Sequence, residues 1–245
     1  MIDFPEALQI QFATYIDAIV LWLTKNYNHI FDAIRDGILF DLNGIESFLV
    51  WIPWALVILI VFLLGWRLKS LLSGIIYTIL VTFIGALGLW DLMMYTLAIV
   101  LVSVVIALVI GIPCGILISA NNILEKISRP ILDAMQTLPS FVYLIPAVMF
   151  FSMGKVPAVF ATTVYALPPI VRLTNLGIRG VNAEMVEAAR SFGSTYWQVL
   201  LKVQLPQALP SIMAGMNQTT MMAMSMVVTA SMIGAKGLGN EVLIA

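Results

Sequence analysis

The stretch Asn182–Pro210, NAEMVEAARSFGSTYWQVLLKVQLPQALP, differs from the rest of this 245-residue chain. It carries four charged residues and is interrupted by Gly193 and Pro206, whereas the whole chain is 61% hydrophobic and only 10% charged. Soluble domains carry about a quarter charged residues, so the surroundings of this stretch predict a protein that has lipid as its solvent. One long polar segment with helix-forming residues in such an apolar chain indicates a specific role for that segment.

Composition also argues against several classes of site. Cys114 is the single cysteine and stands in an apolar run, so no disulfide within the chain is expected. His29 is the single histidine, and we predict no metal site and no catalytic residue. The net charge of −1 gives no basis for a nucleic-acid partner.

The spacing of the charges divides the chain into about six membrane spans, because a helix needs about 20 apolar residues to cross the hydrocarbon core. The uncharged runs are 47–66, 70–90, 92–124, 134–154, 156–171 and about 210–233. The fourth and fifth runs contain prolines and are predicted to be less regular than the others.

Lysine and arginine in the short loops predict the orientation. With the N-terminus outside, the inner loops hold Arg67, Lys69, Lys126, Arg129, Arg179, Arg190 and Lys202. The outer segments then hold only Lys25, Arg35, Lys155 and Lys236. This bias favours an outside N-terminus and places the polar stretch in the cytoplasm.

Residues 1–46 precede the first predicted span. Asp3 and Asp17 interrupt their hydrophobic run, which argues against a signal peptide. Apolar residues recur at steps of three and four and gather on one helical face, namely Leu8, Phe12, Tyr15, Ile16, Ile19 and Leu23. We predict an extracellular amphipathic helix on the membrane surface. A helix packed on the other spans is the alternative.

The polar stretch begins with a predicted short helix. Asn182 is a good N-cap, and Glu184 lies in the first turn, where a negative charge meets the helix dipole. The helix can continue to Phe192, and Gly193 is the natural left-handed residue to end it.

A second short helix is predicted directly afterwards. Thr195 and Gln198 have the spacing of a capping box, and the helix runs through Val203 until Pro206 ends it. In the first helix, Ala188 and Ala189 have small side chains, so another protein can approach this part of the helix closely. We interpret the two helices as a docking element rather than a linker; an ordinary interfacial hairpin is the alternative.

The residues of this hairpin resemble the EAA loop of bacterial ABC-importer permeases. The family pattern is EAA, three residues, glycine, nine residues, isoleucine, one residue and Leu-Pro. It matches 187–189, Gly193, Leu205 and Pro206, and only Val203 departs from it, in place of isoleucine. Three further stretches, 131–148, 166–181 and 216–239, are similar to the permease subunits of glycine betaine/proline importers. The resemblance extends from about residue 91 to the end.

The resemblance implies an all-α integral membrane protein with the transmembrane fold of type I ABC importers. The permease domain would cover 47–245, with a cytoplasmic coupling loop over 180–208. Residues implied to couple to an ATPase are Glu187, Ala188, Ala189, Gly193, Leu205 and Pro206. The chain would be no enzyme and bind no cofactor, because ATP and Mg²⁺ would sit on a separate ATPase subunit. Consistently, the sequence contains no G-x-x-x-x-G-K-[ST] loop, and GAKGLG at 234–239 is expected to be a turn.

The implied partners are an ABC ATPase subunit in two copies, a second permease copy, and an extracellular substrate-binding protein or a fused binding domain. The implied location is the bacterial cytoplasmic membrane, which the chain crosses several times. Because family members usually continue past 237–243, we expect a further C-terminal span, and a fused domain stays open. The implied cargo is glycine betaine or a proline-type compatible solute; choline, carnitine or another small solute is the alternative.

A polar stripe on the sixth predicted span is the candidate translocation path. Gln218, Ser225 and Thr229 share one helical face, and Asn217 and Thr220 lie beside it. Polar groups at membrane depth face a bundle interior or a wet cavity. Hydrogen bonding between helices, worth ~0.6 kcal/mol each, is the alternative reading.

Four other residues have side chains that suit a function. Arg172 is expected to extend to the cytoplasmic interface. Phe141, Tyr143 and Tyr165 are candidates for an aromatic cage around a quaternary ammonium group, although in this family selectivity generally belongs to the binding protein. A secondary transporter or channel would need ionisable residues near mid-membrane, and a membrane enzyme would need clustered catalytic groups; the predicted spans favour neither.

Overall fold

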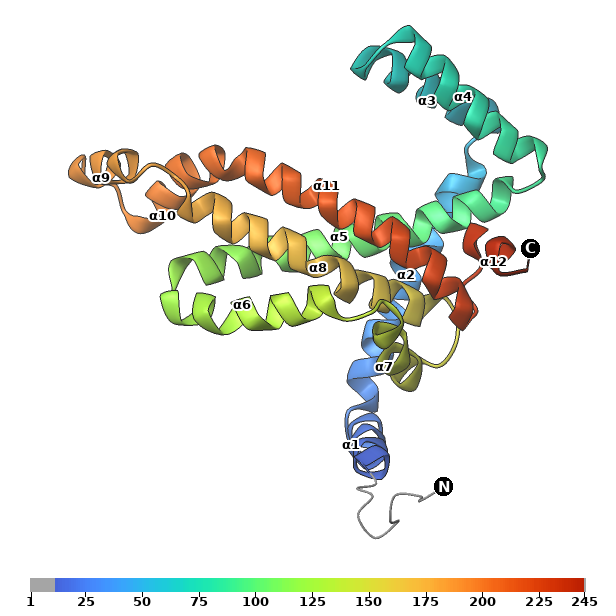
Figure 1. Ribbon diagram of the computed structural model, residues 1–245, viewed down its shortest axis with the longest axis horizontal. Helices are drawn as coiled ribbons and strands as arrows, with labels where there is room; N and C mark the ends of the chain where they lie inside the picture. Colours follow the sequence, from blue (N-terminus) through green and yellow to red (C-terminus); the bar gives the residue numbers. More distant parts are fainter. Residues whose placement is uncertain (1–11, 245) are drawn as a thin grey trace, which may run out of the picture.

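The computed structural model describes residues 12–244, which form helices joined by short turns (Figure 1). Three long helices make the body of the molecule: α5 (Trp90–Ala120), α8 (Lys155–Arg179) and α11 (Leu205–Ala230). They run side by side, and α8 packs extensively on both of the others. Residues 1–11 of the predicted N-terminal segment and Ala245 lie outside the described residues.

Small residues let α5 and α8 approach each other closely. Gly111 and Gly115 are buried on the face of α5 that meets α8. A Cβ atom on Gly111 would lie 2.4 Å from Cγ2 of Ile170, and one on Gly115 would lie 2.6 Å from Cβ of Thr174. Carbon atoms normally pack about 3.5–4.0 Å apart, so a larger residue does not fit at either position. Small residues four apart are a common way for membrane helices to pack.

Two helices, α5 and α8, are long and apolar enough to cross a membrane alone. With 31 and 25 residues they exceed the length of about 20 that a span requires. α11 has 26 residues, but the polar side chains in its middle lower its hydropathy below that of a typical span. Two bent helix pairs provide further candidates, giving up to four spans in residues 12–244 by length and composition. This count is smaller than the predicted six.

The first predicted span, 47–66, is not a single helix. It is divided between α2 (Asn28–Trp51) and α3 (Trp54–Leu68), which meet at an angle of 93°. Ile52 is extended, because the ring of Pro53 disfavours a helical conformation in the residue before it. Hydropathy alone does not predict this change of direction between α2 and α3.

The fourth predicted span, 134–154, is corrected in the same way. α6 (Asn122–Thr137) and α7 (Phe141–Phe151) are bent by 99°, and α7 has only 11 residues. Leu138 is extended immediately before Pro139.

The N-terminal helices α1 (Phe12–Asn26) and α2 lie across the three long helices rather than along them (Figure 1). α2 packs on α5, α7 and α8, and it buries Ile38, Leu42 and Glu46. Phe31 also stacks on Phe150 of α7, with ring centroids 4.9 Å apart. From Asn28 onward the chain is thus a helix packed on the others, whereas Tyr15, Ile16 and Ile19 of α1, which lies in the predicted amphipathic helix, are exposed. Its position relative to a membrane stays a prediction.

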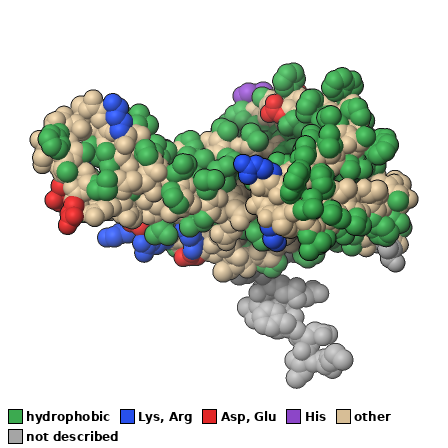
Figure 2. Space-filling model, turned by 90° about the horizontal axis from the view of Figure 1, so that it is seen from above, with side chains coloured by type: hydrophobic (Ala, Val, Ile, Leu, Met, Phe, Trp, Pro, Cys, Tyr) green, Lys and Arg blue, Asp and Glu red, His purple; other side chains and the backbone are tan. Residues whose placement is uncertain are grey.

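Helices α3 and α4 (Leu71–Ala86) form a hairpin that stands away from the body (Figure 1). Its two helices meet at glycines: a Cβ atom on Gly65 would lie 2.8 Å from Cα of Gly74. Figure 2 shows hydrophobic side chains over most of the visible face at this end of the molecule. Such an apolar arm requires lipid or another protein around it.

Candidate functional site

The predicted polar hairpin is present, and its first helix has the predicted ends. The helix α9 (Ala183–Ser191) begins where Oδ1 of Asn182 accepts a hydrogen bond from the Glu184 N–H at 2.9 Å. At its end, the Gly193 N–H donates to Arg190 O at 2.8 Å, and the Ser194 N–H donates to Ala189 O at 3.2 Å. This pair of bonds is a Schellman motif, which requires the left-handed φ of +80° that Gly193 adopts.

The second helix begins as predicted but does not end at Pro206. A capping box is present at Thr195, whose N–H donates to Oε1 of Gln198 at 2.8 Å. The chain then continues through α10 (Tyr196–Val199) and a π-helical segment, η2 (Leu200–Gln204), directly into α11. The predicted break is therefore wrong.

The π segment explains how the proline is accommodated. A proline inside an α-helix removes one hydrogen bond and clashes with the carbonyl four residues earlier. Here the Leu205 N–H donates to Leu200 O, five residues back, so the turn before Pro206 is wider than an α-helical turn. The proline then occupies the first turn of α11, where its missing N–H is tolerated.

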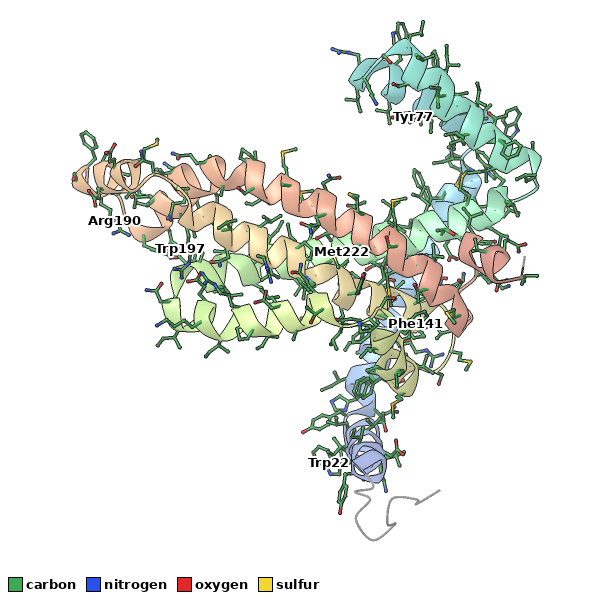
Figure 3. All side chains as sticks on the ribbon, in the orientation of Figure 1. Trp22, Tyr77, Phe141, Arg190, Trp197 and Met222 are labelled. Carbon is green, nitrogen blue, oxygen red and sulfur yellow. The ribbon has the colours of Figure 1, made fainter. Side chains whose placement is uncertain are left out.

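The outer surface of the polar hairpin (residues 182–206) is exposed and partly apolar. Phe192 is 91% exposed and Trp197 is 65% exposed. Arg190 and Trp197 mark this end of the molecule in Figure 3. Glu187 and Ala188 are also exposed, and Ala189, the third sequence-predicted coupling residue of α9, is partly buried. Exposed aromatic side chains on a protruding element mark an interaction surface.

The base of the polar hairpin is joined firmly to the long helices. Leu200 is buried in a small apolar cluster with Ile178 at the end of α8 and Ala208 and Ile212 at the start of α11. Leu205 packs against the same cluster. A force applied to the hairpin is therefore transmitted to the ends of α8 and α11 together.

Ion pairs connect α6 to the same end of α8. The Arg172 guanidinium, which was predicted to extend to the membrane interface, is paired with Asp133 of α6. Nη1 of Arg179 lies 3.1 Å from the carboxylate of Glu125, which also accepts a hydrogen bond from Arg129 at 2.7 Å. The sequence suggested no partner for Arg172, because Asp133 is 39 residues away.

The predicted path residues lie along one open side of α11. Asn217, Gln218 and Ser225 are exposed, whereas Thr220 and Thr229 are partly buried. The hydroxyl of Thr220 donates to Met216 O at 2.9 Å, and that of Ser225 donates to Met221 O at 3.1 Å. Large apolar neighbours on this side are also exposed, including Met213, Met221 and Met224. The face is thus polar and methionine-rich, and residues 12–244 leave it uncovered.

Sequence reasoning missed a set of buried hydroxyl groups between the long helices. Thr162, Thr174 and Thr219 are fully buried, and their hydroxyls have no hydrogen-bond partner in the described part of the chain. Ser103 of α5 does cross to α8, where its hydroxyl donates to Val159 O at 3.3 Å. Thr219 follows Gln218 directly, but it is fully buried, whereas Gln218 is exposed on the open side of α11.

The predicted aromatic cage is only partly assembled. The rings of Tyr143 and Tyr165 meet edge to face with centroids 5.5 Å apart, and the Tyr143 hydroxyl donates to Met135 O. Phe141 is exposed at the start of α7. A cage for a cation requires ring faces that surround one point, whereas these two tyrosines contact each other.

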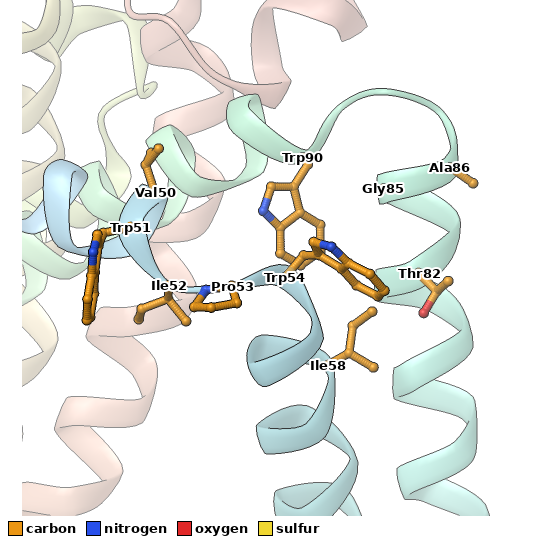
Figure 4. A pocket seen from close by; sticks show the side chains of 10 residues that line it. All are labelled: Val50, Trp51, Ile52, Pro53, Trp54, Ile58, Thr82, Gly85, Ala86 and Trp90. Carbon is orange, nitrogen blue, oxygen red and sulfur yellow. The ribbon is translucent and has the colours of Figure 1, made fainter.

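A larger aromatic hollow lies at the bend between α2 and α3, with a volume of about 560 Å³ (Figure 4). It is lined by Trp51, Trp54 and Trp90 together with residues of α4, and no charged side chain lines it. Thr82 supplies the one side-chain hydroxyl of the lining. The hollow lies where the apolar arm joins α2 and α5, and no residue of α11 lines it.

Comparison with known proteins agrees with this geometry. Residues 107–245 match the family model described as binding-protein-dependent transport system inner membrane component. The structure is similar to that of the MetNI methionine ABC transporter in an inward-facing conformation, with a TM-score of 0.55 and 28% sequence identity. That match covers 60% of this chain and 74% of the other.

Curated relatives match over nearly the whole chain. The glycine betaine transport system permease protein OpuAB of Bacillus subtilis is 47% identical over 96% of this chain and 83% of its own length. The glycine betaine/carnitine transport permease protein GbuB of Listeria monocytogenes is 48% identical, with 98% and 86% covered. The glycine betaine/proline betaine transport system permease protein ProW of Escherichia coli is 46% identical over 91% of this chain but 63% of its own length.

Proposed function

This chain belongs to the family of inner membrane components of binding-protein-dependent transport systems, and we propose that it is the permease of an ATP-driven importer for glycine betaine and related compatible solutes. The single observation that supports this most strongly is the exposed polar hairpin. It carries the six-position EAA pattern and is fixed rigidly to the ends of α8 and α11.

The hairpin is the docking element for a separate ATPase subunit. Phe192 and Trp197 provide apolar anchors, and Glu187 provides a charge beside the small Ala188 and Ala189. Two ATPase copies would hold ATP and Mg²⁺ and bind two copies of this chain. Gly193, Leu205 and Pro206 contribute to coupling by shaping the hairpin and its junction with α11.

In this proposal, transport occurs because the helix bundle alternates between two arrangements. Closure of the ATPases moves the two hairpins, and the buried cluster around Leu200 carries that movement into α8 and α11. The open side of α11, with Asn217, Gln218 and Ser225, would line the path together with the second copy. The partly buried Thr220 and Thr229 border it. ATP selects one arrangement by binding it more tightly than the other.

The cargo is proposed from the functions for which the relatives are named. Glycine betaine is named for OpuAB, ProW and GbuB, and carnitine is also named for GbuB. An extracellular binding protein or a fused domain would deliver the solute to the outer side, where we propose that the N-terminal helices also lie. Choline, carnitine or another small solute is the alternative cargo.

Reconstitution in vesicles tests this proposal. The chain, its ATPase and its binding protein are expected to accumulate labelled glycine betaine only when ATP is present on the cytoplasmic side. Glu187→Lys should abolish substrate-stimulated ATP turnover while membrane insertion is unchanged, whereas the same charge change at the exposed Asp32 of α2 should leave turnover intact. Uptake without ATP, or full turnover in Glu187→Lys, contradicts the proposal. Competition by unlabelled carnitine and choline decides the cargo.

A further inference from the structure

Glu46 is a buried carboxylate in an otherwise apolar stripe. It follows Ile38 and Leu42 at steps of four residues on the packed face of α2, where the pattern calls for a third aliphatic side chain. Its side chain is only 10% exposed, and its Oε1 atom has no hydrogen-bond partner among the described residues. A carboxylate removed from water in this way is costly unless a cation compensates it.

Lys155, the first residue of α8, supplies the cation. Its Nζ atom lies 2.5 Å from Oε2 of Glu46, although 109 residues separate the two in sequence. The same Nζ atom lies 5.2 Å from the centroid of the Tyr95 ring on α5. The ammonium group is thus held between α2, α5 and α8.

The end of α11 is attached to the same place. Next to Lys155, the Gly154 N–H donates to the carbonyl of Ile233 at 3.0 Å, just beyond α11. Gly154 can adopt its φ of +133° because it lacks a side chain. Helices α2, α5 and α8 therefore meet at one ion pair, and the segment after α11 is bonded directly beside it, at the end of the bundle opposite the polar hairpin (Figure 1).

Buried ion pairs are poor sources of stability, because the loss of hydration offsets the attraction, and in some proteins they instead fix the relative position of the elements they join. Losing one partner leaves an uncompensated buried charge, so the pair resists separation. At a rise of about 1.5 Å per residue, the 25 residues of α8 place this pair roughly 37 Å from the polar hairpin. A fixed point at one end and a driven point at the other make α8 and α11 tilt rather than shift.

We propose that Glu46 and Lys155 are positioning residues of the transport cycle. Their ion pair holds the crossing helix α2 against the ends of α5 and α8, beside the backbone bond that ties the segment after α11 to Gly154, and acts as the pivot about which the driven ends move. This inference rests on the proposed function for its role in transport, whereas the clamping of α2 is a property of the chain alone.

The test compares Glu46→Gln, Lys155→Gln and the charge-exchanged double variant E46K/K155E in reconstituted complexes. Each single variant is expected to import at least about tenfold less solute per ATP hydrolysed, and the exchanged pair is expected to recover to within about threefold of the wild type, since coupling between contacting charges is specific to the pair. Asp36→Asn, an exposed acid on α2, is the matched control and should match the wild type. A purely structural role would lower the amount of folded complex but not the ratio of import to ATP turnover.

An isosteric apolar pair and a distance measurement complete the test. If Glu46→Leu combined with Lys155→Met imports normally per ATP, the charges do not position the helices and the proposal is overturned. Spin labels at Asn43→Cys and Met153→Cys, with Cys114 replaced by alanine, should give one narrow distance that broadens in the single variants. An unchanged distribution overturns the clamp. This measurement decides the clamp even if the wild-type complex imports none of the solutes, which would refute only the proposed function.

Discussion

Adding one methyl group at Gly115 should separate α5 from α8. In Gly115→Ala the new Cβ atom would lie 2.6 Å from Cβ of Thr174 and 2.8 Å from the Val171 carbonyl oxygen. The first distance is about 1 Å shorter than an ordinary carbon contact. Since Val171 O is a backbone atom and Cβ of Thr174 is fixed to its helix, no change of side-chain rotamer relieves the clash. The two helices must move apart.

The magnitude is best measured against Gly37→Ala on α2, where a new Cβ atom meets nothing within 4 Å. Alanine gains about 1 kcal/mol over glycine in a helix, and this gain cancels between the two variants. Overpacking then makes Gly115→Ala less stable than Gly37→Ala by about 1–3 kcal/mol. The assay is unfolding in mixed micelles of increasing SDS content, followed by circular dichroism. Equal stability of the two variants would refute the inferred close contact between the helices.

Three further outcomes follow from the geometry. Phe192→Ala should weaken ATPase binding by about 1–4 kcal/mol without altering stability, as measured by co-purification titration, whereas the equally accessible Phe40→Ala should not. Gly193→Val forces a branched side chain to a φ of +80°, which costs at least about 1–2 kcal/mol locally, and substrate-stimulated ATP turnover should fall while membrane insertion stays normal. Cysteine at Ser225 should react with a small polar maleimide in the isolated chain and be protected in the assembled complex, whereas cysteine at the buried Thr219 should stay unreactive in both.

Local rules predicted local structure well. Asn182, Gly193 and the Thr195–Gln198 pair determine the ends of α9 and the start of α10, because each acts through hydrogen bonds to neighbouring backbone groups. The apolar run likewise predicted α5 as a helix, but the run at 156–171 was predicted to be less regular, whereas α8 is one continuous helix through Pro168 and Pro169. Membership of the permease family followed from a few residues at fixed spacing in the hairpin, and comparison with relatives confirms it.

Features that depend on distant partners were not predictable in this way. Hydropathy gives the length of an apolar run but not the direction of the helices within it. It therefore did not predict the bends before Pro53 and Pro139. The rule that Pro206 ends a helix failed because burial of Leu200 beside α8 and α11 favours a continuous helix with one wider turn. Charge spacing placed Glu46 and Lys155 at the same side of the membrane, but their contact requires the folded bundle.

The wider turn at Leu200–Gln204 changes the direction in which side chains before it point, relative to side chains after it. Each residue of an α-helix advances about 100° around the axis, and a π turn holds one residue more than its α-helical equivalent. A helical wheel drawn without interruption from Thr195 to Ala230 therefore gives a wrong angle between Trp197 and Gln218 around the helix axis. The error is about 100°, the rotation of one residue. Deleting a single residue between 200 and 204 would rotate the aromatic anchors by that angle while leaving every one of them present.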